Sequence, residues 1–160
     1  MVFDQSFAAD PAMVMAMLRD PEYVREKGER TGSHDISVTV VDASDGGVVI
    51  TSTRSMPADV PSYAAPFVSD TVTITEVQTW GPLGADATAT ATVTVAFNSP
   101  ISYTGTISLA AGSSGSLVRN AGLFKAGVPF VAGKIERVAA DQTERYLAKE
   151  ATVGAEWLTR

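Results

Sequence analysis

The pattern of apolar and polar residues changes along the chain, from two-residue alternation in the middle to helical periodicity at the end. Alternating apolar and polar side chains predict strands that are buried on one face. The alternation is clearest over residues 85–97, where alanine, valine and phenylalanine share one face and threonine fills the other. We expect seven strands, over residues 2–8, 34–41, 48–56, 72–80, 85–97, 101–109 and from the Gly115 turn to near Lys125.

Sequence signals for helices follow the first strand and the last strand. Asp10-Pro11 and Asp20-Pro21 each place a capping residue before a proline, which predicts short helices over residues 12–19 and 21–29. The pattern from Gly127 to Trp157 predicts one helix of roughly 30 residues, against ~11–12 in a typical globular protein. Such a helix is about 45 Å long, and a strand of about a dozen residues spans about 40 Å, so the helix can lie along a whole sheet.

Clean alternation with short turns indicates an antiparallel sheet that is covered on one side. Seven strands make a sheet about 30 Å wide, whereas a helix is only ~10–12 Å across, so the sheet must curl around the terminal helix. Small side chains at Ala85, Ala87, Ala89 and Ala91, together with Gly105, either leave a cavity on the inner face or let the helix approach closely. We favour the cavity because the helix is narrow.

Composition excludes several classes of function. The 160 residues, 45% hydrophobic and 19% charged, fit a single domain over residues 1–160. The absence of cysteine excludes a disulfide scaffold, thiolate zinc sites and a thiol nucleophile. A net charge of −6 argues against nucleic acid as a partner. We expect no cofactor and no metal site, because a single histidine rarely makes one.

The first residues, Met1-Val2-Phe3-Asp4, lack the basic region and the apolar run of a secretory signal. No stretch reaches the ~18 apolar residues that span a bilayer. We therefore expect a cytoplasmic protein without an integral membrane segment.

Three titratable residues are candidates for chemistry. The even-numbered neighbours of His34 predict that it points inward near one end of the sheet. If the hairpin turns at Asp45, Arg54 lies opposite Ile36 and diagonal to His34, and Glu76 can reach Arg54 from the following strand. Such a cluster could bind the polar end of a ligand, or Glu76 could act as a base with Arg54 stabilising an enolate. The alternative is an ion pair that only balances buried charge.

The proline-rich segment 57–66 cannot be a central strand, and we interpret it as a surface flap. Tyr63 and Phe67 on this flap either close over a cavity mouth and gate entry or anchor the flap to the core. The chain has no G-x-S-x-G, H-E-x-x-H or G-x-G-x-x-G motif, so known catalytic signatures are absent.

Specific residues resemble a known family. They are Val128-Pro129-Phe130-Val131-Ala132-Gly133-Lys134-Ile135-Glu136, then Glu150 and Gly154-Ala155-Glu156-Trp157-Leu158, with Glu76-Val77-Gln78-Thr79-Trp80 on a central strand. Together they resemble the DUF2505 family, which looks like a branch of the START-like (SRPBCC) superfamily of lipid-transfer domains, polyketide cyclases and plant hormone receptors. The resemblance covers essentially the whole chain.

The resemblance implies an α+β helix-grip fold of the START/Bet v 1-like kind. In such a fold a curved antiparallel sheet of about seven strands surrounds a long C-terminal helix, and two short helices follow the first strand. The resemblance also implies an elongated cavity between the sheet and the terminal helix, usually for an apolar small molecule.

We therefore expect non-catalytic binding of a hydrophobic or amphipathic small molecule, for transport or sensing, with His34, Arg54 and Glu76 as polar contacts. One alternative is a cyclase, dehydratase or isomerase that uses the same three residues. Another is a protein-interaction module with a collapsed cavity. The expected cavity lining is Val93, Val95, Tyr103, Ile107, Ile135, Val138, Gln142 and Tyr146.

Overall fold

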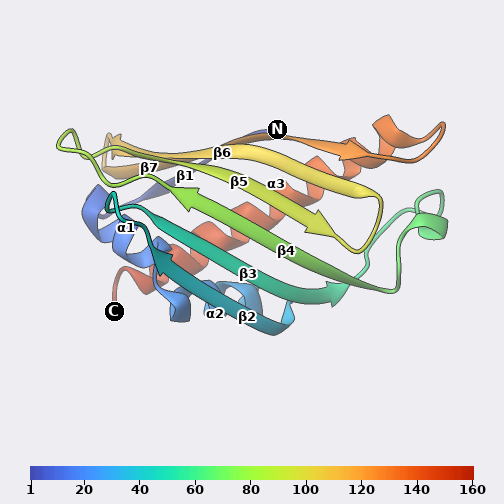
Figure 1. The fold of residues 1–160 in the computed structure, drawn as a ribbon, viewed down its shortest axis with the longest axis horizontal. Helices are drawn as coiled ribbons and strands as arrows, with labels where there is room; N and C mark the ends of the chain where they lie inside the picture. The colour runs from blue at the N-terminus through green and yellow to red at the C-terminus, as the bar shows by residue number, and fades with distance from the viewer.

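The computed structural model describes residues 1–160 as a single sheet with helices on one face (Figure 1). The strands are β1 (Val2–Phe7), β2 (His34–Asp42), β3 (Val48–Pro57), β4 (Thr71–Trp80), β5 (Ala89–Phe97), β6 (Ile101–Gly112) and β7 (Gly115–Ala126). The helices are α1 (Pro11–Leu18), α2 (Pro21–Arg30) and α3 (Ala132–Trp157), with a short 3-10 turn, η1 (Ala65–Phe67), in the flap.

All seven strands form one antiparallel sheet in the order β1-β7-β6-β5-β4-β3-β2. Strands β2 to β6 each pair with the next strand in the chain, whereas β1 pairs with β7, Val2 lying opposite Ala121. Figure 1 shows α3 running behind the strands along the length of the sheet. The predicted helix-grip arrangement, a curved sheet with a long C-terminal helix and two short helices, is confirmed.

The two short helices begin as predicted. The side chain of Asp10 accepts a hydrogen bond from the backbone of Met13, and that of Asp20 accepts one from Glu22, with proline at the start of each helix. Helix α1 contacts β6 and β7, and α2 contacts β2 and α3. The pair therefore covers one end of the inner face of the sheet, to the left in Figure 1.

Helix α3 starts at Ala132, five residues later than the Gly127 that we predicted. Pro129 disfavours a helical conformation at the residue before it, and Phe130 lies in the left-handed region with a φ of 66°. The amide of Val131 then donates to the carbonyl of Pro129 at 2.8 Å, a turn that precedes the helix. The remaining 26 residues still extend about 39 Å, close to the length of β6 and β7.

Strand β5 starts at Ala89 instead of the predicted residue 85. The side chain of Asp86 accepts hydrogen bonds from both the backbone and the hydroxyl of Thr88, and Ala87 has a φ of 59°. These local hydrogen bonds compete with strand pairing, so the alternating pattern continues into a turn. Ala85 and Ala87 are therefore not part of the inner face of the sheet.

The packed core lies under α1 and α2. Ala89 and Ala91, only 4% and 3% exposed, belong to this core, so these alanines pack closely and do not line a cavity. Gly154 of α3 serves the same close packing, because a Cβ there would lie 2.7 Å from a ring carbon of Phe7. The core cluster contains Phe7, Val14, Met15, Met17, Tyr23, Val24, Val48, Ile50, Trp80, Ala89, Ala91, Val93, Tyr103, Ile107, Leu109, Val118 and Val153.

The space that we expected beside Gly105 is occupied by Tyr103. A Cβ at Gly105 would lie 2.7 Å from the phenol oxygen of Tyr103, and Gly122, which pairs with Gly105, lies under the same ring. The closest approach of the α3 backbone is to β7 and β1, at one edge of the sheet. The inner face of β3, β4 and β5 therefore has no helix directly against it beyond the end that α1 and α2 cover.

Candidate functional site

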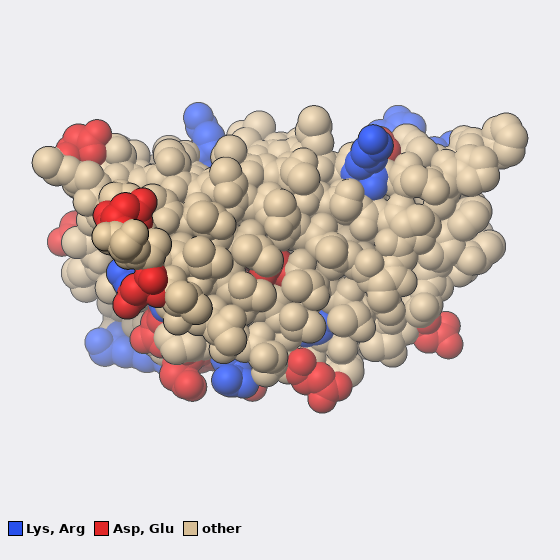
Figure 2. All heavy atoms as spheres, in the orientation of Figure 1, with Lys and Arg blue, Asp and Glu red and all other residues tan.

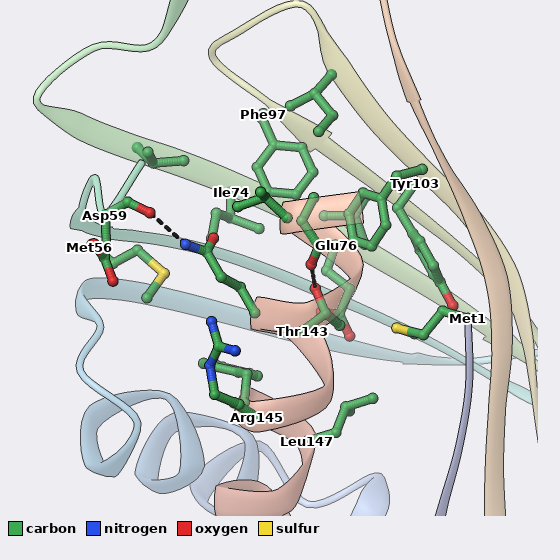
Figure 3. Close-up of a pocket in the computed structure, with 18 of the residues that line it drawn as sticks. Met1, Met56, Asp59, Ile74, Glu76, Phe97, Tyr103, Thr143, Arg145 and Leu147 are labelled. Atoms are coloured by element: carbon green, nitrogen blue, oxygen red, sulfur yellow. Dashed lines mark hydrogen bonds between the residues drawn. The ribbon is translucent and has the colours of Figure 1, made fainter. Parts of the chain in front are cut away.

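A cavity of about 430 Å³ lies between the inner face of the sheet and α3, and its wall continues along the flap (Figure 3). Of the 44 residues that line it, 27 are hydrophobic. Ligand sites are typically concave, mostly apolar spaces with a few polar groups, and this cavity has that character. It is the strongest candidate for a functional site.

Most of the predicted site residues lie in this cavity wall. The wall residues that we predicted are Arg54 from β3, Glu76 from β4, Val93 and Val95 from β5, Tyr103 and Ile107 from β6, and Ile135, Val138, Gln142 and Tyr146 from α3. The apolar members come from strand positions of one parity and from one helix stripe, as the periodicity predicted. That these residues contact a ligand stays a prediction.

The flap forms the wall at the end of the cavity away from the packed core, and Tyr63 and Phe67 both contribute to it. The side-chain amide of Gln142 donates to the carbonyl of Asp59, a bond drawn as a dashed line in Figure 3. The ammonium group of Lys134 lies 5.8 Å from the centre of the Tyr63 ring. Two side chains of α3 therefore tie the flap to the helix. That the flap gates entry stays a prediction.

His34 does not join Arg54 and Glu76, and the prediction that it points inward is wrong. Its side chain is 55% exposed, lies 3.0 Å from the carboxylate of Asp35, and is absent from the cavity wall. The β2–β3 register shifts between His34 and Ser37, and Asp35 has a φ of 51°. This irregularity breaks the two-residue alternation, so the parity of the strand does not extend back to His34.

Arg54 and Glu76 do come together, as predicted, across the pairing of β3 with β4. Two guanidinium nitrogens of Arg54 each lie 3.4 Å from one carboxylate oxygen of Glu76, and one of them also lies 3.3 Å from the hydroxyl of Ser52. The other oxygen of Glu76 accepts a 2.6 Å hydrogen bond from Gln78, whose own carbonyl oxygen accepts one from Trp80 at 2.9 Å. A polar chain therefore runs across β3 and β4 on the inner face.

A second buried ion pair, Lys27 with Glu150, was missed at the level of sequence. The two groups lie 3.3 Å apart, and their side chains are 15% and 10% exposed. Glu150 follows Tyr146 by four residues and so shares its helix face, a signal that could have identified it. Lys27 carried no such signal, because only the packing of α2 against α3 brings it to the cavity.

The charges of this cluster support one another. Burial alone would raise the pKa of Glu76, but the nearby cations Arg54 and Lys27 and the hydrogen bond from Gln78 together bring the pKa below its ordinary value. Burial alone would lower the pKa of Lys27, but the carboxylates of Glu150 and Glu76 raise it overall. Lys27, Arg54 and Glu76 are therefore charged at neutral pH.

Two aromatic rings complete the cluster. The Arg54 guanidinium lies 5.5 Å from the centre of the Tyr146 ring, and the Lys27 ammonium lies 5.9 Å from that of Tyr23. Burial raises the pKa of Tyr23 to about 12, so this phenol remains protonated.

Two other kinds of site are not found in the structure. No three or more His, Cys, Asp or Glu side chains are grouped closely enough to bind a metal ion. None of the helices combines the length and the hydropathy that crossing a bilayer requires.

The fold is similar to that of solved structures. The protein TTHA0849 from Thermus thermophilus superimposes with a TM-score of 0.68 at 12% identity, over 99% of this chain and 96% of that one. CV1439 from Chromobacterium violaceum gives a TM-score of 0.47 at 13% identity, over 97% of this chain and 96% of that one. Mll3558 from Rhizobium loti gives 0.43 at 14% identity, over 96% and 94%.

At the level of sequence, no curated protein matches the chain. A family match covers nearly all of it, residues 3–158, and agrees with the resemblance seen at both ends of α3. The matching family carries the description "Protein of unknown function (DUF2505)", and the chain belongs to this family.

Proposed function

We propose that the protein binds a hydrophobic or amphipathic small molecule in the cavity between its sheet and α3, without covalent chemistry, for transport or sensing. The observation that carries this proposal is the cavity itself, about 430 Å³ within the ~300–1,000 Å³ range of ligand sites. We also propose that the family is a branch of the START-like (SRPBCC) superfamily. The order of the elements and the position of the cavity support that relationship.

The physical basis is the division of the inner face. Helices α1 and α2 and the C-terminal half of α3 fill one end with large side chains. Over the other end, the N-terminal half of α3 stands across from β3, β4 and β5 without a second helix between them. Apolar side chains on both sides face this space. An apolar ligand would bury their surface, and each Å² removed from water would contribute roughly 25 cal/mol to the binding free energy.

The enzyme alternative has less support. It needs Glu76, His34 and Arg54 in one pocket, and His34 lies outside the cavity wall. A general base works best when its pKa is near the operating pH, whereas the surrounding cations bring that of Glu76 below its ordinary value. The interaction-module alternative required a collapsed cavity, and the open volume counts against it.

Native mass spectrometry after incubation with a cell extract of lipids and metabolites tests the proposal. We expect a retained, chemically unchanged molecule on the wild-type protein. Ala139→Trp should abolish retention, because Ala139 lies in the wall and a tryptophan there occupies the cavity. Ala155→Trp, on the exposed side of the same helix, is the matched control and should retain the molecule. Absence of any adduct on the wild type, or equal retention by Ala139→Trp, would contradict the proposal.

A further inference from the structure

The cavity wall is not uniformly apolar. It includes the charged cluster of Lys27 from α2, Arg54 from β3, Glu76 from β4 and Glu150 from α3. Figure 3 shows Glu76 projecting from the sheet toward α3, and the flap residue Asp59 lies apart from it. A ligand in this space therefore meets apolar walls toward the flap and a charged wall toward α2. This division suits an amphipathic molecule.

Hydrogen-bond donors are in excess in the charged cluster. The contacts of Arg54 with Glu76 and Ser52, 3.3 to 3.4 Å, are longer than the ~2.7–2.9 Å of a close charge-assisted hydrogen bond. The Nε of Arg54 is buried and has no partner at all. Lys27 can donate three hydrogen bonds, and its ammonium has one carboxylate near it, that of Glu150 at 3.3 Å. Both oxygens of Glu76, in contrast, already accept hydrogen bonds.

The net charge of the wall side chains also favours an anionic ligand. The wall contains four cationic side chains, Lys27, Arg54, Arg145 and Lys149, and three anionic ones, Asp59, Glu76 and Glu150. The charged side chains of the wall therefore sum to +1, whereas the chain as a whole has a net charge of −6. The wall therefore favours a ligand that carries negative charge.

We propose that the ligand is an amphipathic carboxylic acid whose carboxylate binds between Arg54 and Lys27 and whose apolar chain extends toward the flap. This inference rests on the proposed function and specifies its ligand class. A carboxylate matches the planar fork of a guanidinium and supplies the acceptors that both cations lack. A neutral alcohol supplies a weaker acceptor without the charge, and an amine adds a third cation beside Arg54 and Lys27.

Three molecules of equal chain length test the assignment on the wild-type protein. Isothermal titration calorimetry at neutral pH compares dodecanoic acid, dodecanol and dodecylamine, each below its aggregation concentration. We expect the acid to bind about 10- to 100-fold more tightly than the alcohol, as one or two hydrogen bonds to charged groups would give, and the amine to bind most weakly. This comparison needs no variant and so does not depend on how substitutions affect folding.

Variants then locate the head group. Arg54→Gln and Lys27→Gln should each reduce acid binding to within about threefold of alcohol binding and leave alcohol binding nearly unchanged. Arg54→Lys, which keeps the charge but removes the fork, should give an intermediate loss, and near-UV circular dichroism checks that each variant folds. Arg137→Gln is the control, because Arg137 is an exposed cation of α3 outside the cavity wall.

The outcomes separate this inference from the proposed function. Equal affinity for acid and alcohol, or tightest binding of the amine, overturns the carboxylate assignment and leaves a binding cavity in place. An acid preference that persists in both Arg54→Gln and Lys27→Gln overturns the placement of the head group. Failure of all three molecules to bind also overturns the assignment, and the extract experiment above then decides the proposed function independently.

Discussion

One larger side chain on α3 can test whether the cavity is empty space. Ala139 is half-buried and lies in the cavity wall. Leucine has nearly the same helix propensity as alanine, so Ala139→Leu changes little except the apolar volume that projects from the helix. The effect of this substitution on stability therefore reports the space in front of residue 139.

The magnitude follows from the three carbons that leucine adds. Burial of one methylene stabilises a protein by about 0.8 kcal/mol, so complete burial of three would contribute about 2.4 kcal/mol. Because the site is only half-buried, we expect roughly 1 kcal/mol of added stability. In a tightly packed wall, the same substitution would instead destabilise the protein by about 1–3 kcal/mol, so the two cases differ in sign.

Urea unfolding followed by far-UV circular dichroism measures this difference, and a shift of ~2–4 °C in Tm should accompany each 1 kcal/mol for a chain of this size. Ala155→Leu makes the same change on the exposed face of α3 and should leave the free energy of unfolding within about 0.5 kcal/mol of wild type. If Ala139→Leu lowers the stability by about 1 kcal/mol or more relative to Ala155→Leu, the wall is already packed and the reasoning about the hollow is refuted.

Three further predictions concern individual side chains. The pKa of Glu76 in the folded protein lies below its unfolded value of 4.5, so ionisation of Glu76 stabilises the fold above about pH 4.5 and this contribution is lost at lower pH. Glu76→Gln should therefore show a shallower fall in the free energy of unfolding than wild type between about pH 5 and 3. Equal slopes for the two proteins would contradict this. Trp80 lies in the cavity wall and Trp157 does not, so ligand binding should change tryptophan fluorescence in Trp157→Phe and not in Trp80→Phe. Gln142→Leu removes the hydrogen bond to Asp59, so stopped-flow association and dissociation rates should both rise severalfold while Kd changes little; unchanged rates, or a change in only one of the two, would argue against a gating flap.

Regular elements of this fold were predictable because their patterns are local. The two Asp-Pro caps and the stripe of α3 were correct, and so was the β2–β3 register from Ser37 onward. The pairing of β3 with the following strand, β4, also brings Arg54 within reach of Glu76 as predicted, a contact between residues 22 positions apart. These successes have the same origin, since hairpin pairing and helix periodicity depend on sequence spacing alone.

The errors occurred where a local backbone feature interrupts a pattern. The left-handed residue Asp35 and the register shift beside it turn His34 away from the cavity. The hydrogen bonds of Asp86 delay the start of β5 to Ala89, and Phe130 delays the start of α3. An alternating pattern continues through such a position without any sign of the interruption.

The position of Lys27 could not be predicted for a different reason. Its contact with Glu150 depends on how α2 docks against α3, and nothing in the spacing of either helix determines that arrangement. The location of the cavity was similarly hidden. The small residues Ala89 and Ala91 suggested space, but α1 and α2 fill that end, and the hollow lies beside the larger side chains Val93 and Val95.

The pairing of β1 with β7 has a consequence for the order of folding. Strands β2 to β7 can zip together through successive hairpins whose partners are near one another in the chain, whereas Val2 must wait for Ala121 to be synthesised. Helix α3 follows later still, and its backbone rests on the edge that β1 and β7 form together. A nascent chain that stalls before this edge is complete therefore exposes the apolar side of a nearly finished meander, and chaperones would be needed most at that stage of synthesis. The opposite face of the sheet, which is turned toward the viewer in Figure 2, carries few charged side chains over its centre.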